Sequence, residues 1–411
     1  MTAVEPRQRA QVALSYLTFV LVGVNAGVGG VVLPAQMADY GVDRTTIGIT
    51  FFTFSAGFML ASGVTGPLLH ALGFRWALVA GGAAFVVGGL WMATRPPLVG
   101  LIAVQVLAGL GIGTTESVLN THLTTLPGSN VLLGRLHAFF GVGALLGPVL
   151  ATWTLRSFPW TTVAFITAVP FIPVVAAFVL THRDAGEVHS RQAPSPGTPQ
   201  GAASEHHSRA LGIVARQPAV VLAAVFLAVY VGLEISVGNW GFSYLVGERH
   251  SSDVVAGNAV SGFWLGLTLG RFVISPVAER LGWTLGRTTT ACLAGVVATS
   301  LLIWTAPPAA VATVGLGVLG FCLGPLFPTT MAVMPLVTAR RHVPAAIGLL
   351  NGVSVLGSSG LPWIAGALTQ GVGLWTLFPF VALLAVVQLL LWRPLVARIG
   401  TAEAGTAAEV G

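Results

Sequence analysis

The sequence predicts an all-α integral membrane protein with twelve transmembrane helices, arranged as two six-helix bundles. Of its 411 residues, 55% are hydrophobic and 8% are charged, which leaves too few charges to cover a soluble surface of this size. The mean hydropathy of +0.85 points the same way. Long charge-free runs alternate with short segments that hold the arginines, and a polar stretch divides the chain near its middle.

Six membrane-spanning segments are expected before the polar stretch. The first, Ala10–Ala38, is free of charge and too long for the core of a signal peptide, so we interpret it as a retained span. The next five charge-poor runs are Thr45–Phe74, Trp76–Thr94, Pro96–Leu126, Leu136–Leu155 and Ser157–His182.

Residues 183–216 are rich in proline, glycine, serine and mixed charge, and we expect a flexible linker there. Six further spans follow it. Two lie near Val220–Val246 and Val254–Ser275, and the uncharged run Thr288–Ala339 and the run His342–Trp392 are each long enough for two. The expected organisation is therefore a six-helix bundle over 1–182, the linker over 183–216, a second bundle over 217–398 and a tail over 399–411.

The arginines predict the orientation of the chain, because positive charge is retained on the cytoplasmic side. With the N-terminus inside, fourteen of the nineteen arginines lie on cytoplasmic segments, Arg271 lies within a span, and four face outward: Arg44, Arg95, Arg156 and Arg249. We therefore expect both termini and the linker to be cytoplasmic, in a multi-pass protein of the plasma membrane.

The composition also excludes several classes of function. The chain has no lysine, so neither a P-loop nor a Schiff-base cofactor is expected. Cys292 and Cys322 lie in apolar runs without metal-ligand spacing, and the arginines are scattered rather than clustered as in a nucleic-acid-binding face. The glycine strings Gly109–Gly113 and Gly141–Gly147 lie inside apolar helices and indicate close helix packing, not nucleotide loops. We expect no enzyme, no cofactor, no bound metal and no nucleic-acid partner, and we expect a monomer.

Two motifs recur in the two halves. Gly66-Pro-Leu-Leu-His70-Ala-Leu-Gly73, after the second span, resembles Ser275-Pro-Val-Ala-Glu279-Arg-Leu-Gly282, after the eighth. The pair Gly134-Arg-Leu-His137 and Gly348-Leu-Leu-Asn351 is similarly placed in the fifth and eleventh spans. Such a parallel repeat is typical of transporters built from two six-helix halves.

The six-plus-six pattern, the central linker and the repeated turn resemble the major facilitator superfamily over nearly the whole chain. Within it, the chain is similar to the fucose permease-like branch, which moves sugars with protons. The stretches that carry this similarity are Thr115-Glu116-Ser-Val-Leu-Asn120, Tyr230-Val-Gly-Leu-Glu234-Ile-Ser-Val-Gly-Asn239-Trp240, Gly262-Phe-Trp264-Leu-Gly-Leu-Thr-Leu-Gly270-Arg271 and Gly324-Pro-Leu-Phe-Pro328-Thr.

The resemblance implies roles for particular residues. Glu116 corresponds to the proton-coupling carboxylate of the fourth span. In the conformational gate, His70 stands where the family has an aspartate. Arg75 follows it in the first half, and Arg271, Glu279 and Arg280 form a charged counterpart in the second. The family's acidic residue in the first span is replaced, because the sequence there reads Gly29-Gly30-Val-Val-Leu33-Pro34.

The residues themselves point to two intramembrane acids. Glu116 interrupts an apolar span and shares one helical stripe with Gly109, Gly113 and Asn120, and an ionisable group inside a bilayer is a functional-site hypothesis by default. Glu234 lies almost at the centre of its span, one helical turn from Tyr230. Each acid could instead hold two helices together, and that alternative stays open.

Aromatic and amide side chains around these acids suit a hydroxylated ligand. The candidate substrate-binding residues are Asn25, Asn120, Tyr230, Glu234, Asn239, Trp240 and Trp264. Helix contact and interface anchoring are the alternatives for the amides and tryptophans. For Arg271, we expect a position near the cytoplasmic end of its span, where it snorkels or pairs with Glu279.

Together these features predict a secondary active transporter that alternates access between its two halves, with a small molecule, protons and the bilayer as its partners. Uptake of a sugar or similar polar solute with protons is the leading hypothesis. Proton-driven export of a drug or secondary metabolite is the alternative, because a buried acid serves either direction.

Overall fold

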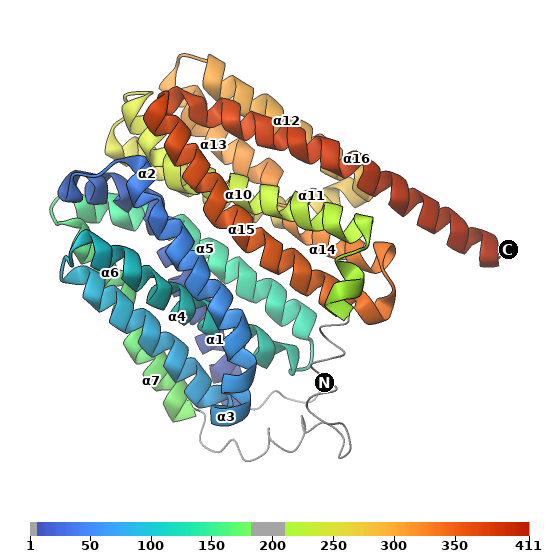
Figure 1. Cartoon of the computed structure of the whole chain (residues 1–411), viewed down its shortest axis with the longest axis horizontal. Coiled ribbons are helices and arrows are strands. Elements are labelled where there is room, and N and C mark those ends of the chain that lie inside the picture. The colour runs from blue at the N-terminus through green and yellow to red at the C-terminus, as the bar shows by residue number, and fades with distance from the viewer. Residues whose placement is uncertain (1–5, 182–209, 411) are drawn as a thin grey trace. The chain divides into compact units, whose positions relative to one another are not determined.

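The computed structural model describes residues 6–181 and 210–410, and these form helices joined by short connections, with no strand in either range (Figure 1). Eleven helical segments of these ranges are long and apolar enough to cross a membrane. The prediction of an all-helical membrane protein is confirmed. Most of the expected linker, residues 183–209, lies outside the described residues.

The chain divides into two compact units. Unit 1 comprises Met1–Ala193 and Ser252–Trp264, and unit 2 comprises Pro194–Ser251 and Leu265–Gly411. The helices of unit 1 are α1 (Pro6–Tyr40), α2 (Arg44–Ile47), α3 (Ile49–Ala93), α4 (Leu98–Thr124), α5 (Ser129–Leu155), α6 (Trp160–Ala168) and α7 (Phe171–Thr181). Helix α11 (Asp253–Arg280) begins in unit 1 and continues in unit 2. The other helices of unit 2 are α10 (Pro218–Gly247), α12 (Leu285–Thr305), α13 (Ala309–Leu323), α14 (Leu326–Val337), η1 (Arg340–His342), α15 (Val343–Gly371), η2 (Leu374–Thr376) and α16 (Leu377–Val410).

Helix α3 is not one straight rod. Gly73 interrupts it with φ 73° and ψ 173°, a backbone conformation that glycine adopts without steric cost. A straight helix of 45 residues would be about 68 Å long at 1.5 Å per residue. Its two ends nevertheless lie close together, because Arg95, two residues after α3, forms an ion pair with Asp39 at the end of α1, the helix from which the chain reaches α3 through the short helix α2. Helix α3 therefore folds back on itself at Gly73.

Gly282 occupies the matching place in the repeated turn and also has a positive φ, of 65°. The two motifs aligned in the sequence thus both end on a glycine with a positive φ. This agreement is a structural counterpart of the internal repeat, since a side chain would be strained at either position.

Glycines set the close approach of several helices. A Cβ added at Gly109 of α4 would lie 2.0 Å from the carbonyl oxygen of Phe54 on α3, and one added at Gly143 of α5 would lie 2.0 Å from that of Val20 on α1. The interpretation of the two glycine strings as packing surfaces is therefore confirmed. Small residues let helix backbones meet in a membrane, where lipid removes the hydrophobic driving force between helices.

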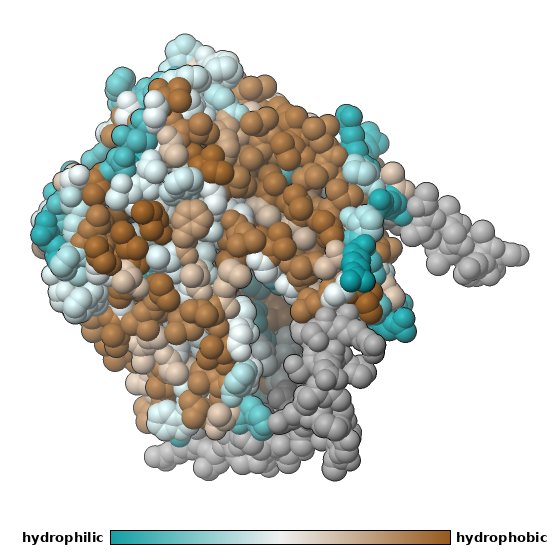
Figure 2. Space-filling model, in the orientation of Figure 1, coloured by the Kyte–Doolittle hydropathy of each residue, from teal (hydrophilic) through white to brown (hydrophobic). Residues whose placement is uncertain are grey.

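Large apolar side chains cover much of the outer surface, as the brown areas over α15 and α16 in Figure 2 show. Val99 on α4, Leu180 on α7 and Val314 on α13 are each about two-thirds exposed or more, at 77%, 69% and 67%. Exposed apolar area on this scale is typical of helices that face lipid.

Candidate functional site

The clearest polar site inside a membrane-spanning segment lies in unit 2. Tyr230 and Glu234 are one turn apart on α10, and Arg271 of α11 approaches them. The Nη2 atom of Arg271 lies 3.9 Å from Oε1 of Glu234, and the two side chains are 24% and 10% exposed. The arrangement is an ion pair within the apolar part of the unit.

Close backbone contacts place these three side chains. On α15, a Cβ added at Gly357 would lie 2.0 Å from the carbonyl oxygen of Ala228, two residues before Tyr230. On the other side, a Cβ added at Gly324, at the end of α13, would lie 2.5 Å from the backbone nitrogen of Arg271. Glycines on two neighbouring helices thus fix the backbones that carry the tyrosine and the arginine.

The site holds unused hydrogen-bond donors. The Tyr230 hydroxyl and the Nε atom of Arg271 are buried, and neither makes a hydrogen bond of good geometry with the residues that the structure describes. The Tyr230 ring packs 6.3 Å from the ring of Phe327 on α14. Buried donors without acceptors are costly, so the cluster is suited to a ligand that supplies oxygen atoms.

Arg271 corrects one expectation. We expected it to snorkel or to pair with Glu279, but its ion pair is with Glu234. Glu279 is exposed at the end of the helix, eight residues further on, which corresponds to about 12 Å along the axis at 1.5 Å per residue.

The candidate residues around Glu234 have different surroundings. Trp240 is fully buried, and its indole N–H donates to the carbonyl oxygen of Pro362 on α15 at 2.8 Å. This contact matches the helix-packing alternative, so we leave Trp240 out of the proposed site. Asn239 is half-buried on the same helix.

Three further candidates lie in unit 1. Trp264 is buried and packs edge-on against Phe263, with ring centroids 5.4 Å apart. Asn25 is half-buried on α1. Asn120 donates its amide N–H to the carbonyl oxygen of Glu116 at 2.9 Å, one turn back on α4. Their roles in substrate binding stay predictions.

Glu116 is the intramembrane acid of unit 1. It lies past the middle of α4 and is half-buried, and its carboxylate makes no ion pair or hydrogen bond with another described residue. Gly113, one turn before it, packs against Ala61 and Phe58 of α3. Helix α4 is thus packed closely against α3 beside this acid, and the proton-coupling role of Glu116 stays a prediction.

The residues expected to form a conformational gate lie at helix ends. His70, Glu279 and Arg280 are exposed, and the guanidinium of Arg75 lies 5.1 Å from the ring centroid of Trp76. Gly73 and Gly282, the glycines with positive φ described above, lie close to these residues in the sequence. Their gating role stays a prediction.

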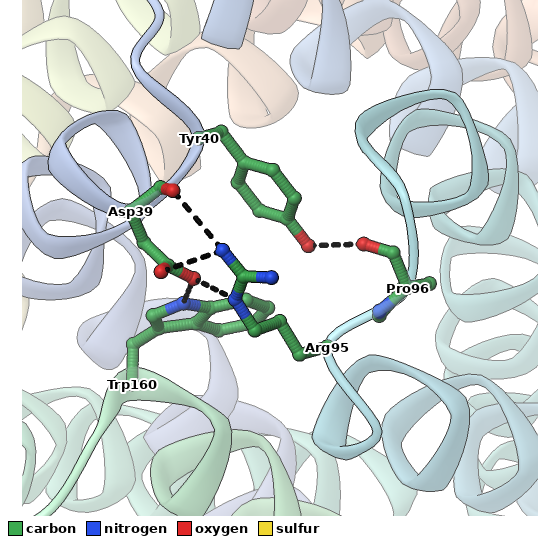
Figure 3. A network of polar contacts seen from close by, with 5 residues as sticks. All are labelled: Asp39, Tyr40, Arg95, Pro96 and Trp160. Carbon is green, nitrogen blue, oxygen red and sulfur yellow. Dashed lines mark hydrogen bonds and ion pairs between the residues drawn. The ribbon is translucent and has the colours of Figure 1, made fainter.

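A polar network in unit 1 joins four helix ends, and no sequence pattern indicated it (Figure 3). The guanidinium of Arg95 donates to both carboxylate oxygens of Asp39, at 2.8 and 2.9 Å, and the indole N–H of Trp160 donates to the same carboxylate at 2.9 Å. The Tyr40 hydroxyl donates to the carbonyl oxygen of Pro96. Hydrogen bonding to Asp39 raises the pKa of Arg95, whose backbone has a φ of 54°. We call this network the Asp39 clasp.

Unit 2 has a corresponding clasp of different chemistry. Arg249, just after α10, donates from Nε to the Tyr244 hydroxyl at 2.9 Å and from Nη2 to the carbonyl oxygen of Trp304 at 2.8 Å. The acceptors at the end of α12 are backbone carbonyls that the helix leaves unsatisfied. We call this network the Arg249 clasp. In the sequence, Arg95 and Arg249 are isolated charges between two apolar runs. Either clasp becomes visible only when the structure brings distant segments of the chain together.

The comparisons with known proteins assign the family. The family model described as Major Facilitator Superfamily matches residues 15–252, more than half of the chain. The chain belongs to the major facilitator superfamily. Like other members of this superfamily, it is a membrane transporter and not an enzyme.

The curated proteins that are similar to this chain do not share one named solute. It is 26% identical to Bypass of stop codon protein 6 of Saccharomyces cerevisiae over 90% of this chain and 79% of that protein. It is also 26% identical to the 4-hydroxybenzoate transporter PcaK of Pseudomonas aeruginosa, over 43% of this chain and 40% of that protein. The glucose/mannose transporter GlcP of Bacillus subtilis is 24% identical over 45% of each chain.

Solved structures share the fold of this superfamily member. The nucleoside transporter NupG superposes with a TM-score of 0.73 at 14% identity, over 96% of this chain and 99% of that one. A bacterial homologue of the human lysosomal transporter Spinster, inward-facing and unoccupied, gives 0.71 at 14% identity, over 97% and 98% of the two chains. At this identity the likeness establishes the fold alone.

Proposed function

We propose that this transporter takes up a sugar or similar small polar solute together with protons, by alternating access between its two halves. The observation that carries the proposal is Glu116, a half-buried carboxylate on a membrane-spanning helix with no charged partner among the described residues. Such a group is expensive to keep ionised in a bilayer, so it takes up a proton on one side and loses it when water reaches it on the other.

In this proposal the solute binds beside the Tyr230, Glu234 and Arg271 cluster. The support is the set of buried donors that lack acceptors there, together with a charged pair at the depth where transporters of this fold hold their ligands. Asn25, Asn120, Asn239 and Trp264 are further candidates for contact with the solute, and His70, Arg75, Glu279 and Arg280 act in the gate.

The names of the relatives fit a small polar solute. They include transporters named for glucose and mannose and for 4-hydroxybenzoate, and the resemblance to the fucose permease-like branch favours a sugar. Export of a drug or secondary metabolite would use the same parts of the protein. The direction of net flux under a pH gradient separates these two functions.

We also propose twelve crossings of the plasma membrane by a monomer with both termini in the cytoplasm. Eleven candidate segments become twelve crossings if α3, which folds back at Gly73, crosses twice. The arginine distribution supports the orientation, since the helix ends joined by the Asp39 clasp would then face outward, where arginine is sparse.

The test of coupling uses purified protein in proteoliposomes and a panel of labelled sugars and other small polar solutes. Wild-type protein should concentrate its solute when only an inward pH gradient is supplied. Glu116→Gln keeps the shape but cannot ionise, so it should lose accumulation and keep solute exchange at equal pH. Full accumulation by Glu116→Gln would remove the acid from the coupling role, and pH-driven expulsion of solute would establish export instead.

A further inference from the structure

Arg271 is a cation within a membrane-spanning helix, and its ion pair is loose. The separation of 3.9 Å from Glu234 exceeds the about 2.7–2.9 Å of a direct charge-assisted hydrogen bond. The guanidinium has five N–H donors in one plane, and its Nε makes no hydrogen bond with the residues that the structure describes. The side chain is still 24% exposed, so a solute can reach it.

Glu234 is the acid that balances this cation. It is the single charged residue in the sequence of α10, and α13, α14 and α15 carry none. The titratable groups with described side chains on the helices packed around it are Tyr230 and Tyr244 on α10, Cys322 on α13, Arg393 and Arg398 on α16, and Asp253, Arg271, Glu279 and Arg280 on α11. Of these, Tyr230 and Arg271 are the ones that interact with Glu234.

This charge balance limits what a ligand can do. If Glu234 takes up a proton, Arg271 is left as an uncompensated cation in an apolar layer, which is unfavourable. A neutral sugar cannot replace the lost negative charge. A carboxylate can, and its two oxygens match the planar fork of an arginine.

We propose that the transported solute carries a carboxylate, which binds Arg271 and the Tyr230 hydroxyl while Glu234 is protonated. A hydrogen ion from the surrounding solution joins the Glu234 carboxylate, and the carboxylate of the solute becomes the counter-ion of Arg271. The net charge of the cluster is the same before and after binding. This inference rests on the proposed transport function and narrows its solute to organic acids, including sugar acids.

The test measures equilibrium binding by the purified full-length protein, from the shift of its thermal unfolding midpoint. Two pairs of matched size serve as probes: gluconate with glucose, and 4-hydroxybenzoate with 4-hydroxybenzyl alcohol. The acid of at least one pair should stabilise the protein, and its neutral partner should not. Binding should weaken between about pH 5.5 and about pH 8, by up to about tenfold per pH unit, as linkage to one proton requires.

Variants distinguish this scheme from a structural ion pair. Glu234→Gln mimics the protonated acid, so binding of the anion should remain tight at the higher pH and lose its pH dependence. Arg271→Gln should lose anion binding at both pH values. If that variant does not fold, Arg271→Lys keeps the charge without the fork and should weaken binding at least tenfold.

Three outcomes would overturn the inference: equal stabilisation by acid and neutral partner, a retained pH dependence in Glu234→Gln, or no stabilisation by either acid at either pH. Because binding in detergent requires no gradient, it is separate from the transport assay. Arg156→Gln is the control, since it removes an exposed arginine outside the site and should keep the pH-dependent binding. If the protein takes up glucose with protons but binds neither acid, the proposed transport function stands and the inference that the solute carries a carboxylate is wrong.

Discussion

At the scale of single residues, the partner of a charged side chain decides its role. Arg271 has an acid on its own helix, Glu279, but that acid is exposed two turns away, whereas Glu234 of another helix lies 3.9 Å from it. Asp39 likewise accepts a hydrogen bond from Arg95, which is 56 residues away in the sequence. In both cases, the pairing converts an isolated charge into part of a site or a clasp.

The Asp39 clasp gives a prediction at this scale. Asp39→Asn removes the charge and one acceptor of a bidentate pair, leaving donors of Arg95 and Trp160 without an anionic partner. We expect the thermal unfolding midpoint in detergent to fall by a few degrees, and Arg95→Gln to add little once Asp39 is replaced.

Arg156 supplies the control for this experiment. It is an exposed arginine of unit 1 whose guanidinium lies 4.8 Å from the ring centroid of Trp153. Arg156→Gln should leave the unfolding midpoint nearly unchanged. If the effects of Asp39→Asn and Arg95→Gln are fully additive, the two residues do not stabilise the protein as a pair.

At the scale of helices, glycine contacts position the functional side chains. Gly357 brings α15 against the backbone of α10 next to Tyr230, and Gly324 brings α13 against the backbone of Arg271. These contacts are between backbones, so an added methyl group has no flexible side chain to displace. A small change there should move a whole helix rather than one rotamer.

Gly357→Ala tests this positioning. Its new Cβ would lie 2.0 Å from the carbonyl oxygen of Ala228, so α10 and α15 must separate, and overpacking of this kind costs about 1–3 kcal/mol. We expect a lower unfolding midpoint together with weaker solute binding.

Gly352 provides a matched substitution on α15, because a Cβ added there meets no atom within 4 Å. Gly352→Ala should be neutral or stabilising by about 0.5–1 kcal/mol, through the higher helix propensity of alanine. Equal loss of binding in both variants would mean that α15 does not tolerate alanine for some reason other than contact with α10.

At the scale of the whole molecule, the number of crossings depends on how α3 is counted. If α3 crosses twice, the α4–α5 connection is cytoplasmic and the α10–α11 connection faces outward. If α3 crosses once, both connections change sides. The topology is therefore a sharp test of the hairpin at Gly73.

Single cysteines can measure this topology. With Cys292 and Cys322 replaced, an impermeant maleimide added to intact cells should label Ser252→Cys and should not label Thr125→Cys until the cells are opened. Both positions are exposed in the structure. Labelling of Thr125→Cys in intact cells would contradict twelve crossings with cytoplasmic termini.

The sequence by itself determined the helical membrane class, nearly all of the spans and the superfamily resemblance. These are local properties, because a membrane-spanning helix satisfies its backbone hydrogen bonds within its own segment and shows its length and polarity directly. Glu116, Tyr230 and Glu234 stood out for the same reason, as polar groups inside apolar runs.

Only the tertiary structure decided which groups meet. Several contacts depend on the lateral packing of helices that are distant in sequence. They are the ion pair of Glu234 with Arg271, the hydrogen bond from Trp240 to Pro362, and both clasps. That packing is set by many weak contacts and a few glycines, and no local pattern encodes it. The charges were visible in the sequence, and their partners required the fold.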